Sequence, residues 1–291
     1  MKIAILSRRP DLYANHRLIA EANARGWHAA VVDPLAGFSE GVSVQFMHEA
    51  SFRQLRDFDA VIPRYGPIWQ RQAHGLLLQL ENQGIRSLNS AHAIDLVRNA
   101  AACQERMTQN DLPFPKTVLF YDENSGFIKP EMLPFDYPMV FKRQYSSQGS
   151  GVELITGPAM LADRSSKCFD QHEAFLVQEF IAEANTSDLR LMVMEGKLVA
   201  AMRRSAKAGE FRANMHLGAK ASALSASVEL EQLAVKAASA VGLQMAGVDI
   251  IQAKRGPLLL EINACPGFEA LEAASGVNVA GKLLDLLVSQ K

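Results

Sequence analysis

Short apolar segments alternate with helical segments at the start of this chain, and this alternation restricts the fold more than any other feature. We expect strands at residues 3–6, 29–32 and 60–63. We expect helices at residues 12–24, 72–82 and about 91–110, the last with Ser90 as its N-cap. Helices of this length between strands indicate a parallel sheet, so the sequence predicts an α/β front domain.

The chain changes character after the segment Leu112-Pro113-Phe114-Pro115, which no helix can cross. Beyond it, expected strands outnumber helices, at residues 138–142, 152–156, 174–181, 189–194, 197–203, 246–252 and 257–263, with one helix at 228–241. Several of these strands are close enough to form hairpins. The sequence therefore predicts an α+β body after the α/β front. We expect three regions, at residues 1–90, 91–178 and 179–291.

Size and composition indicate an ordinary globular protein. The chain has 291 residues, a formal net charge of −1 and 48% hydrophobic residues, which suits about two domains. A near-neutral balance gives no sign of nucleic-acid or membrane binding. The cysteines Cys103, Cys168 and Cys265 are too scattered for a zinc site or a disulfide framework. We expect a cytoplasmic protein, because no signal peptide or spanning segment is recognisable.

The last expected hairpin places two acids opposite each other. If its loop is Lys254-Arg255-Gly256, Ala253 pairs with Pro257. Counting back along both strands then sets Asp249 opposite Glu261. Opposed carboxylates repel, but a divalent cation between them reverses the effect. Asn263 lies two residues beyond Glu261 and so on the same face, which completes an oxygen set suited to magnesium. The alternative is that the acids simply face solvent on an exposed sheet.

A lysine and a polar loop suggest phosphate contacts. Lys142 ends an apolar strand, and the loop that follows is rich in serine and glycine. Such a loop offers backbone N–H groups and hydroxyls to phosphates. It is not a Walker sequence. A hairpin tip without a ligand is the alternative explanation.

A second hairpin turns at Glu195-Gly196. A two-residue turn there places Asp188 opposite Arg203 and Arg190 opposite Ala201. The basic residues that follow are Arg203, Arg204, Lys207 and Arg212. They form either a cradle for an anion or a solvated basic face. The chain has no GxSxG elbow and no GxGxxG after its first strand, which disfavours hydrolases and dinucleotide enzymes.

Taken together, these segments resemble the ATP-grasp superfamily, and most closely its RimK branch. The resemblance runs along nearly the whole chain, through MKIAILSRRPDLY, FDAVIPRYG, VQEFI, DLR and VAAMRRSAKAGEFRANMH. It is strongest in AGVDIIQAKRGPLLLEINACPGFEALEAASGVNVAGK. RimK-type enzymes add glutamate to the C-terminus of the sixth small-subunit ribosomal protein. Their fold holds a nucleotide between two sheet-containing subdomains.

The resemblance implies roles for the matching residues. The implied ATP-binding residues are Lys142, Gln178, Glu179, Phe180, Ile181, Asp188, Arg212, Ala213 and Asn214. The implied flap over the phosphates contains Ser146, Ser147, Gln148, Gly149 and Gly151. Two Mg²⁺ ions, which Mn²⁺ can replace, would bind Asp249, Glu261 and Asn263, with Glu261 bridging. Arg203 and Arg204 would steady the acyl phosphate and the γ-phosphoryl group.

The chain departs from the family pattern at two positions. The family has Arg-Asp-Lys before the proline break, and its lysine reaches a nucleotide phosphate, whereas this chain has Arg98-Asn99-Ala100. Ser146 stands where the flap usually has its first glycine. Neither departure touches the metal hairpin, and both leave room for weak ATP affinity, an altered substrate or lost activity.

The resemblance thus predicts an ATP-dependent carboxylate–amine ligase that forms an amide through an acyl phosphate. Its partners would be ATP, an amino acid such as glutamate, and the C-terminus of an acceptor protein or peptide, in particular the ribosomal protein. The family also implies a homo-oligomer, such as a tetramer. The alternatives are a small-molecule amino-acid ligase of the same fold and a non-catalytic nucleotide-binding relative.

Overall fold

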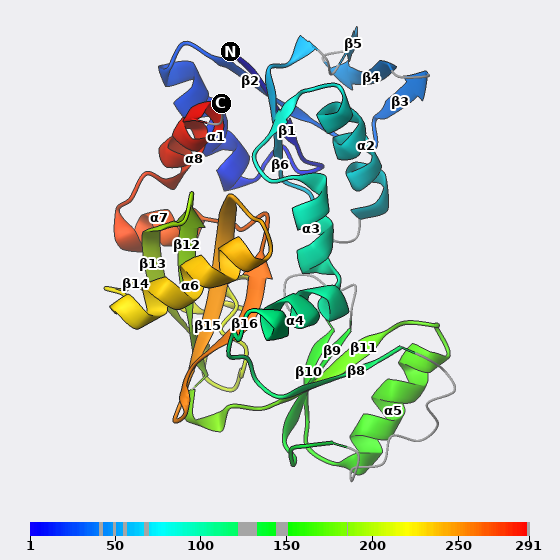
Figure 1. The fold of residues 1–291 in the computed structure, drawn as a ribbon, viewed down its shortest axis with the longest axis vertical. Helices are drawn as coiled ribbons and strands as arrows, with labels where there is room; N and C mark the ends of the chain where they lie inside the picture. Colours follow the sequence, from blue (N-terminus) through cyan, green and yellow to red (C-terminus); the bar gives the residue numbers. More distant parts are fainter. Residues whose placement is uncertain are drawn as a thin grey trace.

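The structure is a computed structural model that describes residues 1–291 except 41–42, 49–50, 55–56, 67–69, 122–132, 144–150, 185 and 290–291. It contains a front domain and two further sheets stacked along the longest axis of the molecule (Figure 1). Among the described helices, none is both long and apolar enough to span a membrane.

The front domain is built on a parallel sheet with the strand order β2-β1-β6-β7, as the alternating pattern predicts. Its strands are β1 (Lys2–Leu6), β2 (His28–Val32), β6 (Ala60–Pro63) and β7 (Arg86–Ser87). Helices α1 (Tyr13–Ala24) and α8 (Val279–Ser289) pack on one face, where Leu18 and Leu283 meet Ile3 and Ile5. Helix α2 (Gln70–Asn82) packs on the other face through Leu77. The last helix of the chain therefore completes the first domain.

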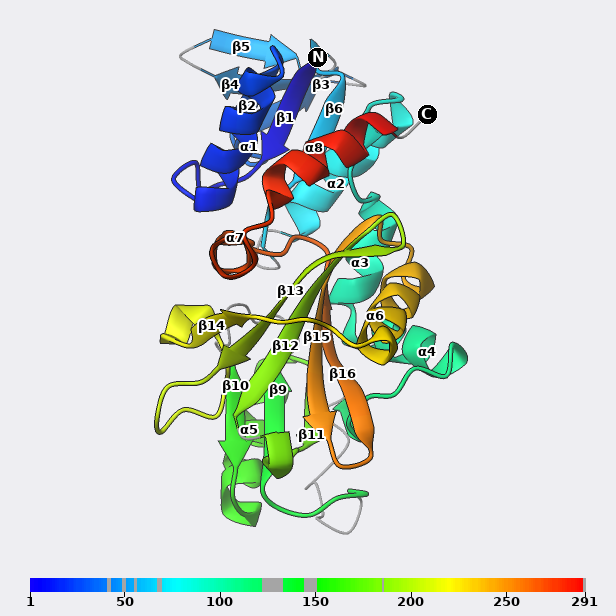
Figure 2. The ribbon, with the colours of Figure 1, turned by 90° about the vertical axis from the view of Figure 1, so that its left-hand side faces the viewer.

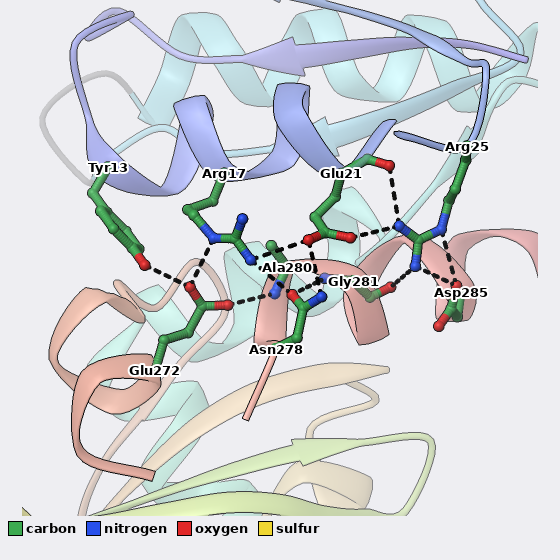
Figure 3. A network of polar contacts seen from close by, with 9 residues as sticks. All are labelled: Tyr13, Arg17, Glu21, Arg25, Glu272, Asn278, Ala280, Gly281 and Asp285. Carbon is green, nitrogen blue, oxygen red and sulfur yellow. Dashed lines mark hydrogen bonds and ion pairs between the residues drawn. The ribbon is translucent and has the colours of Figure 1, made fainter. Parts of the chain in front are cut away.

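A polar network, here called the α1–α8 brace, joins α1 to α7 (Glu269–Ser275) and α8 (Figure 3). Its central acid is Glu272, which accepts hydrogen bonds from Tyr13 Oη at 2.7 Å, Arg17 Nε at 3.1 Å and the Ala280 backbone N–H at 3.0 Å. The other side chains of the brace are Glu21, Arg25, Asn278 and Asp285. The brace ties the two ends of the chain together.

The structure adds a three-stranded antiparallel sheet that the sequence analysis missed. Its strands are β3 (Gly37–Glu40), β4 (Ser43–His48) and β5 (Ser51–Gln54), which follow one another as a meander. The sequence pattern predicts strands at residues 29–32 and 60–63 and none between them.

The single helix expected up to about residue 110 is in fact two helices, α3 (Ala91–Arg98) and α4 (Ala100–Gln109). Ser90 is the N-cap of α3, as predicted, and accepts from the Ala93 N–H at 3.1 Å. Asn99 ends α3 in an extended conformation and caps α4, because its side-chain oxygen accepts from the Ala102 N–H at 3.2 Å. An asparagine can satisfy a new helix start in this way, and the apolar periodicity alone does not reveal it.

The small sheet has the strand order β10-β9-β11-β8. Its strands are β8 (Thr117–Phe120), β9 (Met139–Arg143), β10 (Val152–Ile155) and β11 (Phe175–Glu179). Phe141 and Phe175 stack at 4.8 Å between ring centroids on the face that α5 (Pro158–Phe169) covers. Side chains alternate along a strand, so Val140 and Lys142 point to the opposite face.

The large sheet has the strand order β14-β13-β12-β15-β16. Its strands are β12 (Ser187–Met194), β13 (Lys197–Ser205), β14 (Lys220–Ala223), β15 (Met245–Ala253) and β16 (Gly256–Asn263). One face packs on α6 (Val228–Ala240) and on α3 and α4 through Leu191, Val248 and Ile262. The other face packs on α7 and α8 only at one end, through Met192 and Met245 (Figure 2). Its remaining half carries the charged residues described below.

Candidate functional site

The hairpin of β15 and β16 sets Asp249 directly opposite Glu261, as predicted. The path to that register differs from the prediction, because Ala253 pairs with Gly256 around a two-residue turn. A bulge then lets Asp249 pair with Glu261 while Ile250 pairs with Leu259. The shorter turn and the extra residue at the bulge compensate each other, so the acids meet although the assumed loop was wrong.

Asp249 is buried and held by two arginines of the same sheet, one on the adjacent strand β12 and one on β13. Arg190 binds it in a bidentate manner at 2.7 and 2.6 Å, and Arg204 Nη2 adds a third bond at 2.8 Å. Although burial opposes ionisation, these guanidinium groups hold the pKa of Asp249 below its usual range. Asp249 is therefore ionised and fixed in direction.

Asp188 shares Arg204 with Asp249. Arg204 Nε and Nη2 donate to the Asp188 carboxylate at 2.6 and 2.7 Å. Burial raises the pKa of Asp188 to about 6, against the opposing charge of Arg204. The three side chains form a continuous buried network across β13, β12 and β15.

The predicted register of the Glu195-Gly196 hairpin is wrong by one residue. Met194 pairs with Lys197 as expected, but a bulge after Met192 makes Asp188 pair with Arg204 and Arg190 with Met202. Strand alternation then puts Arg204 on the face of Asp188 and Arg203 on the opposite face. A bulge leaves no mark in the pattern of apolar residues, so the sequence analysis could not place it.

Glu261 and Asn263 complete the polar face of this hairpin. With the Asn263 amide oriented to match its neighbours, its nitrogen donates to Glu261 Oε1 at 2.9 Å and its oxygen accepts from Arg190 Nη2 at 3.3 Å. Glu261 is exposed to solvent. The protein around it, together with the charge of Asp249, nevertheless raises its pKa. The charge of Asp249 therefore disfavours ionisation of the Glu261 carboxyl group.

The small sheet directs Lys142 and Gln178 toward this hairpin. Lys142 Nζ donates to Gln178 Oε1 at 2.8 Å, and Gln178 Nε2 donates to Thr117 Oγ1 at 2.9 Å. Burial lowers the pKa of Lys142, while the charges of Glu261 and Asp249 oppose that shift. Lys142 is thus close enough to interact electrostatically with the acids of the large sheet.

The segment after β11 connects the two sheets. Glu179 forms an ion pair with Arg255 at the tip of the β15–β16 hairpin and accepts from the Lys116 N–H at 3.2 Å. The Phe180 ring meets the Phe211 ring edge-on at 6.3 Å, and Ile181 is buried against the hairpin. Apolar side chains therefore line this connection between the two sheets.

The predicted phosphate-side segment lies over the small sheet. Arg212 pairs with Glu210 at 2.7 Å, and its Nη1 donates to the Val152 carbonyl at 3.2 Å. Ala213 is buried, and Asn214 is half-buried beside it. This loop therefore links β13 to the edge strand β10.

The flap lies mostly outside the described residues. Ser146, Ser147, Gln148 and Gly149 belong to that part of the chain, whereas Gly151 is described and has φ +74°. A positive φ favours glycine at this position.

Ala100 begins α4, and neighbouring Arg98 donates to the Tyr65 carbonyl and lies 4.8 Å from the Tyr65 ring centroid.

The turn after Asn263 is fixed from two sides. Buried Asn89 donates to the carbonyls of Met245 and Ala264, both at 2.8 Å, and its oxygen accepts from the Met245 N–H at 3.1 Å. Gly247 pairs with Asn263, and a Cβ at Gly247 would come within 2.6 Å of the Pro266 Cβ. The turn therefore packs directly on the ladder that carries Asp249.

Arg190 is the site residue that sequence reasoning missed. It lies two residues after Asp188 and so on the same face, which strand alternation could have revealed. In the part of the chain that the structure describes, no three His, Cys, Asp or Glu residues gather as a metal site. The oxygen set here consists instead of Asp249, Glu261 and the amide of Asn263.

Comparison with known proteins places this arrangement in a family. The model of the RimK-like ATP-grasp domain matches residues 97–287, and that of the RimK PreATP-grasp domain matches residues 1–94. The chain belongs to the RimK-like ATP-grasp family. It is an ATP-grasp ligase, with the front domain and ATP-grasp body that the sequence predicts.

Relatives of this RimK-like chain include a "Probable alpha-L-glutamate ligase" of Aeromonas salmonicida (strain A449). It is 38% identical over 289 residues, which are 99% of this chain and 96% of the relative. The RimK domain protein ATP-grasp of Sphaerobacter thermophilus superposes with a TM-score of 0.74 at 22% identity, over 99% of this chain and 100% of that one. The ATP-grasp ligase PsnB, complexed with minimal precursor, Mg and ADP, superposes with a TM-score of 0.71 at 21% identity, over 99% and 96%.

Proposed function

We propose that this protein is an ATP- and magnesium-dependent carboxylate–amine ligase that adds glutamate to the C-terminus of a small-subunit ribosomal protein. The observation that carries the ligase proposal is the rung of Asp249 and Glu261 with Asn263 on the same face. The glutamate is proposed from the name of the Aeromonas relative.

The residues of the hairpin fit a hard divalent cation. Asp249 is ionised and Glu261 is exposed to solvent, and both offer oxygen atoms beside the Asn263 amide. Asp249, Glu261 and Asn263 would hold Mg²⁺, or Mn²⁺ in its place, with Glu261 shared between two ions. When bound, the ions neutralise charge on the phosphates. They also relieve the repulsion between Asp249 and Glu261.

ATP would lie between the two sheets. Lys142 and the flap residues Ser146, Ser147, Gln148, Gly149 and Gly151 would contact its phosphates. The adenine and ribose would meet Gln178, Glu179, Phe180, Ile181 and Asp188, and the phosphate side would meet Arg212, Ala213 and Asn214. The electrostatic coupling of Lys142 to the acids of the other sheet supports this placement.

The chemistry consists of two displacements. The acceptor carboxylate attacks the γ-phosphorus and releases ADP, which leaves an acyl phosphate. The amine of the incoming amino acid then attacks the acyl carbon and releases inorganic phosphate, so an amide forms and the amine loses a proton. Arg204 and Arg190 would steady negative charge at the reacting groups from their positions beside Asp249. Arg203 stays a predicted contributor, although it lies on the opposite face of β13 from Arg204.

The proposal is tested by measuring ADP release with Mg²⁺ and a panel of amino acids, with and without the ribosomal protein. We expect release that requires glutamate and the acceptor together, and none from Glu261→Gln. Turnover on free amino acids alone would instead indicate a small-molecule ligase. ADP formation that no amino acid or acceptor increases would indicate a nucleotide-binding protein without ligase activity, an alternative that Ala100 suggests.

The family also suggests a cytoplasmic homo-oligomer, such as a tetramer. Light scattering of the purified chain tests the oligomeric state. A monomer at all concentrations would contradict that part of the proposal.

A further inference from the structure

Arg64 lies at the carboxyl end of the parallel sheet in the front domain. It directly follows β6, and its backbone N–H donates to the Leu6 carbonyl at the end of β1, at 2.9 Å. In the strand order β2-β1-β6-β7, the chain passes from β1 to β2 on one side of β1 and later to β6 on its other side. Ligands of open parallel sheets bind at the carboxyl ends of the strands, where the order reverses in this way.

The Arg64 side chain is buried without an acidic partner. Only 9% of the residue is exposed. Its Nη1 donates to the Pro266 carbonyl at 2.7 Å, and the guanidinium lies 5.5 Å from the Phe268 ring centroid. No ion pair joins it to a carboxylate among the described residues, and burial lowers its pKa. A buried guanidinium without a counter-ion is costly, so its presence calls for a negatively charged ligand.

One edge of this guanidinium is unused. Arg190 and Arg204 both bind aspartate through the edge formed by Nε and Nη2. In Arg64 the Nε is buried with no hydrogen-bond partner, and Nη2 has none within the described part of the chain. Nη1 meanwhile anchors the group to Pro266. Arg64 therefore offers the bidentate edge that its two counterparts have filled.

This edge lies close to the reacting centre. Pro266 packs on Gly247, which pairs with Asn263 across the ladder. Pro266 is also three residues after Asn263, a span of at most about 10 Å. Arg64 approaches the turn from the front domain, whereas Lys142 approaches the hairpin from the small sheet. Arg64 is thus placed for a substrate other than ATP.

We propose that Arg64 binds a carboxylate of the amino-acid substrate through its Nε–Nη2 edge and so sets the substrate class as α-amino acids with a free carboxylate. The inference rests on the proposed ligase function. Arg190 and Arg204 have committed this edge to Asp249 and Asp188. Arg98 also reaches the turn, at Cys265, but its Nη2 donates to the Tyr65 carbonyl. The amino acid must keep its carboxylate bound while its amine reacts, and a buried bidentate contact does this.

The test compares Arg64→Lys and Arg64→Met with the wild type and with Arg25→Gln, which removes an arginine of the α1–α8 brace. We expect KM for glutamate to rise about 10- to 100-fold in both Arg64 variants. KM for ATP and for the acceptor should stay within about twofold, as should every constant of Arg25→Gln. An unchanged glutamate KM, or a rise in acceptor KM instead, would overturn the inference.

A binding measurement on the wild type covers the case in which the variants do not fold. L-glutamate should raise the melting temperature, whereas its dimethyl ester, which has no free carboxylate, should not. Equal shifts would overturn the inference. Failure of the proposed function can be told apart from failure of this inference. If the wild type had no turnover but bound glutamate, and Arg64→Lys did not bind it, the proposed function would be wrong and the carboxylate site would stand.

Discussion

The α1–α8 brace and the network on the large sheet both join arginines to carboxylates, but they differ in how completely their charges are matched. In the brace, Glu272 and Glu21 each accept several donors, and these hydrogen bonds lie within the brace itself (Figure 3). On the large sheet, Asp188 and Asp249 share Arg204. Glu261 faces solvent, and its pKa is raised. The brace thus matches its carboxylates with donors of its own, whereas the sheet network leaves the Glu261 carboxylate open to solvent.

The largest difference should appear when the acids of the hairpin are neutralised. We expect Glu261→Gln to lower turnover by about 10³-fold or more, because the cation and the phosphates lose their ligand. Without metal, its free energy of unfolding should equal or exceed that of the wild type, since repulsion with Asp249 is gone. ADP release and urea unfolding in chelator measure both quantities.

Asp249→Asn is the matched variant, because it removes the other acid of the same rung. It should lose activity to a similar degree but also lose about 3 kcal/mol of stability or more, since Arg190 and Arg204 keep their buried charges. Near-normal turnover in either variant would contradict the metal assignment.

The brace should show the reverse behaviour. Glu272→Gln removes the charge that Tyr13 and Arg17 bind, so we expect a loss of about 1.5–3 kcal/mol in the free energy of unfolding. Turnover per folded molecule should change less than twofold, because the brace touches none of the reacting groups. A large fall in turnover with unchanged stability would show that the brace belongs to the active site.

Glu21 of the brace and Asp188 of the sheet network should also respond oppositely to pH in metal-free protein. Hydrogen bonding to Arg25 lowers the pKa of Glu21 below its ordinary 4.5. Its contribution to stability is therefore present above that value and lost as pH falls below it. Burial raises the pKa of Asp188 from 3.8 to about 6, so its contribution is full below 3.8 and is lost as pH rises through 6.

Unfolding experiments between about pH 3.5 and 7, a range that spans both pKa shifts, measure this contrast. The deficit of Glu21→Gln relative to the wild type should grow with pH. The deficit of Asp188→Asn should shrink by about 1–3 kcal/mol. Deficits that change in the same direction would contradict the difference between the networks.

The smallest effect concerns Ala100, where this chain lacks the family lysine. Ala100→Lys should tighten ATP binding about two- to tenfold by adding a phosphate contact. Calorimetric titration with ATP and Mg²⁺ measures it, with Ala101→Lys as the control on the next residue of α4. Unchanged or weaker binding would mean that another residue already makes this contact.

The sequence predicts local pairing better than it predicts irregularities. The apolar pattern and turn residues located the hairpin that joins Asp249 to Glu261, but its two-residue turn and its bulge were not predicted and offset each other. They did not locate the bulge after Met192, which decides whether Arg203 or Arg204 faces Asp188. Nor did they reveal that Asn99 divides a helix, since a cap depends on a local hydrogen bond rather than on periodicity.

Long-range contacts were beyond sequence reasoning altogether. Arg64 becomes a candidate ligand-binding residue because folding buries it beside Pro266, 202 positions away in the sequence. Likewise, the brace depends on α8 returning to the first domain, which no local pattern encodes. Such features arise from tertiary packing, which brings together residues that are distant in the sequence.

The close approach of Gly247 to Pro266 has a consequence for how the enzyme moves. A backbone in contact with a proline ring leaves no free volume for sliding, so the metal ladder and the following turn form a single rigid body. Asn89 extends that body into the front domain. The small sheet meets this body through polar contacts such as Glu179–Arg255 and Arg212–Val152. We therefore expect any opening of the molecule to move the small sheet, while the β15–β16 ladder and the turn after it stay together.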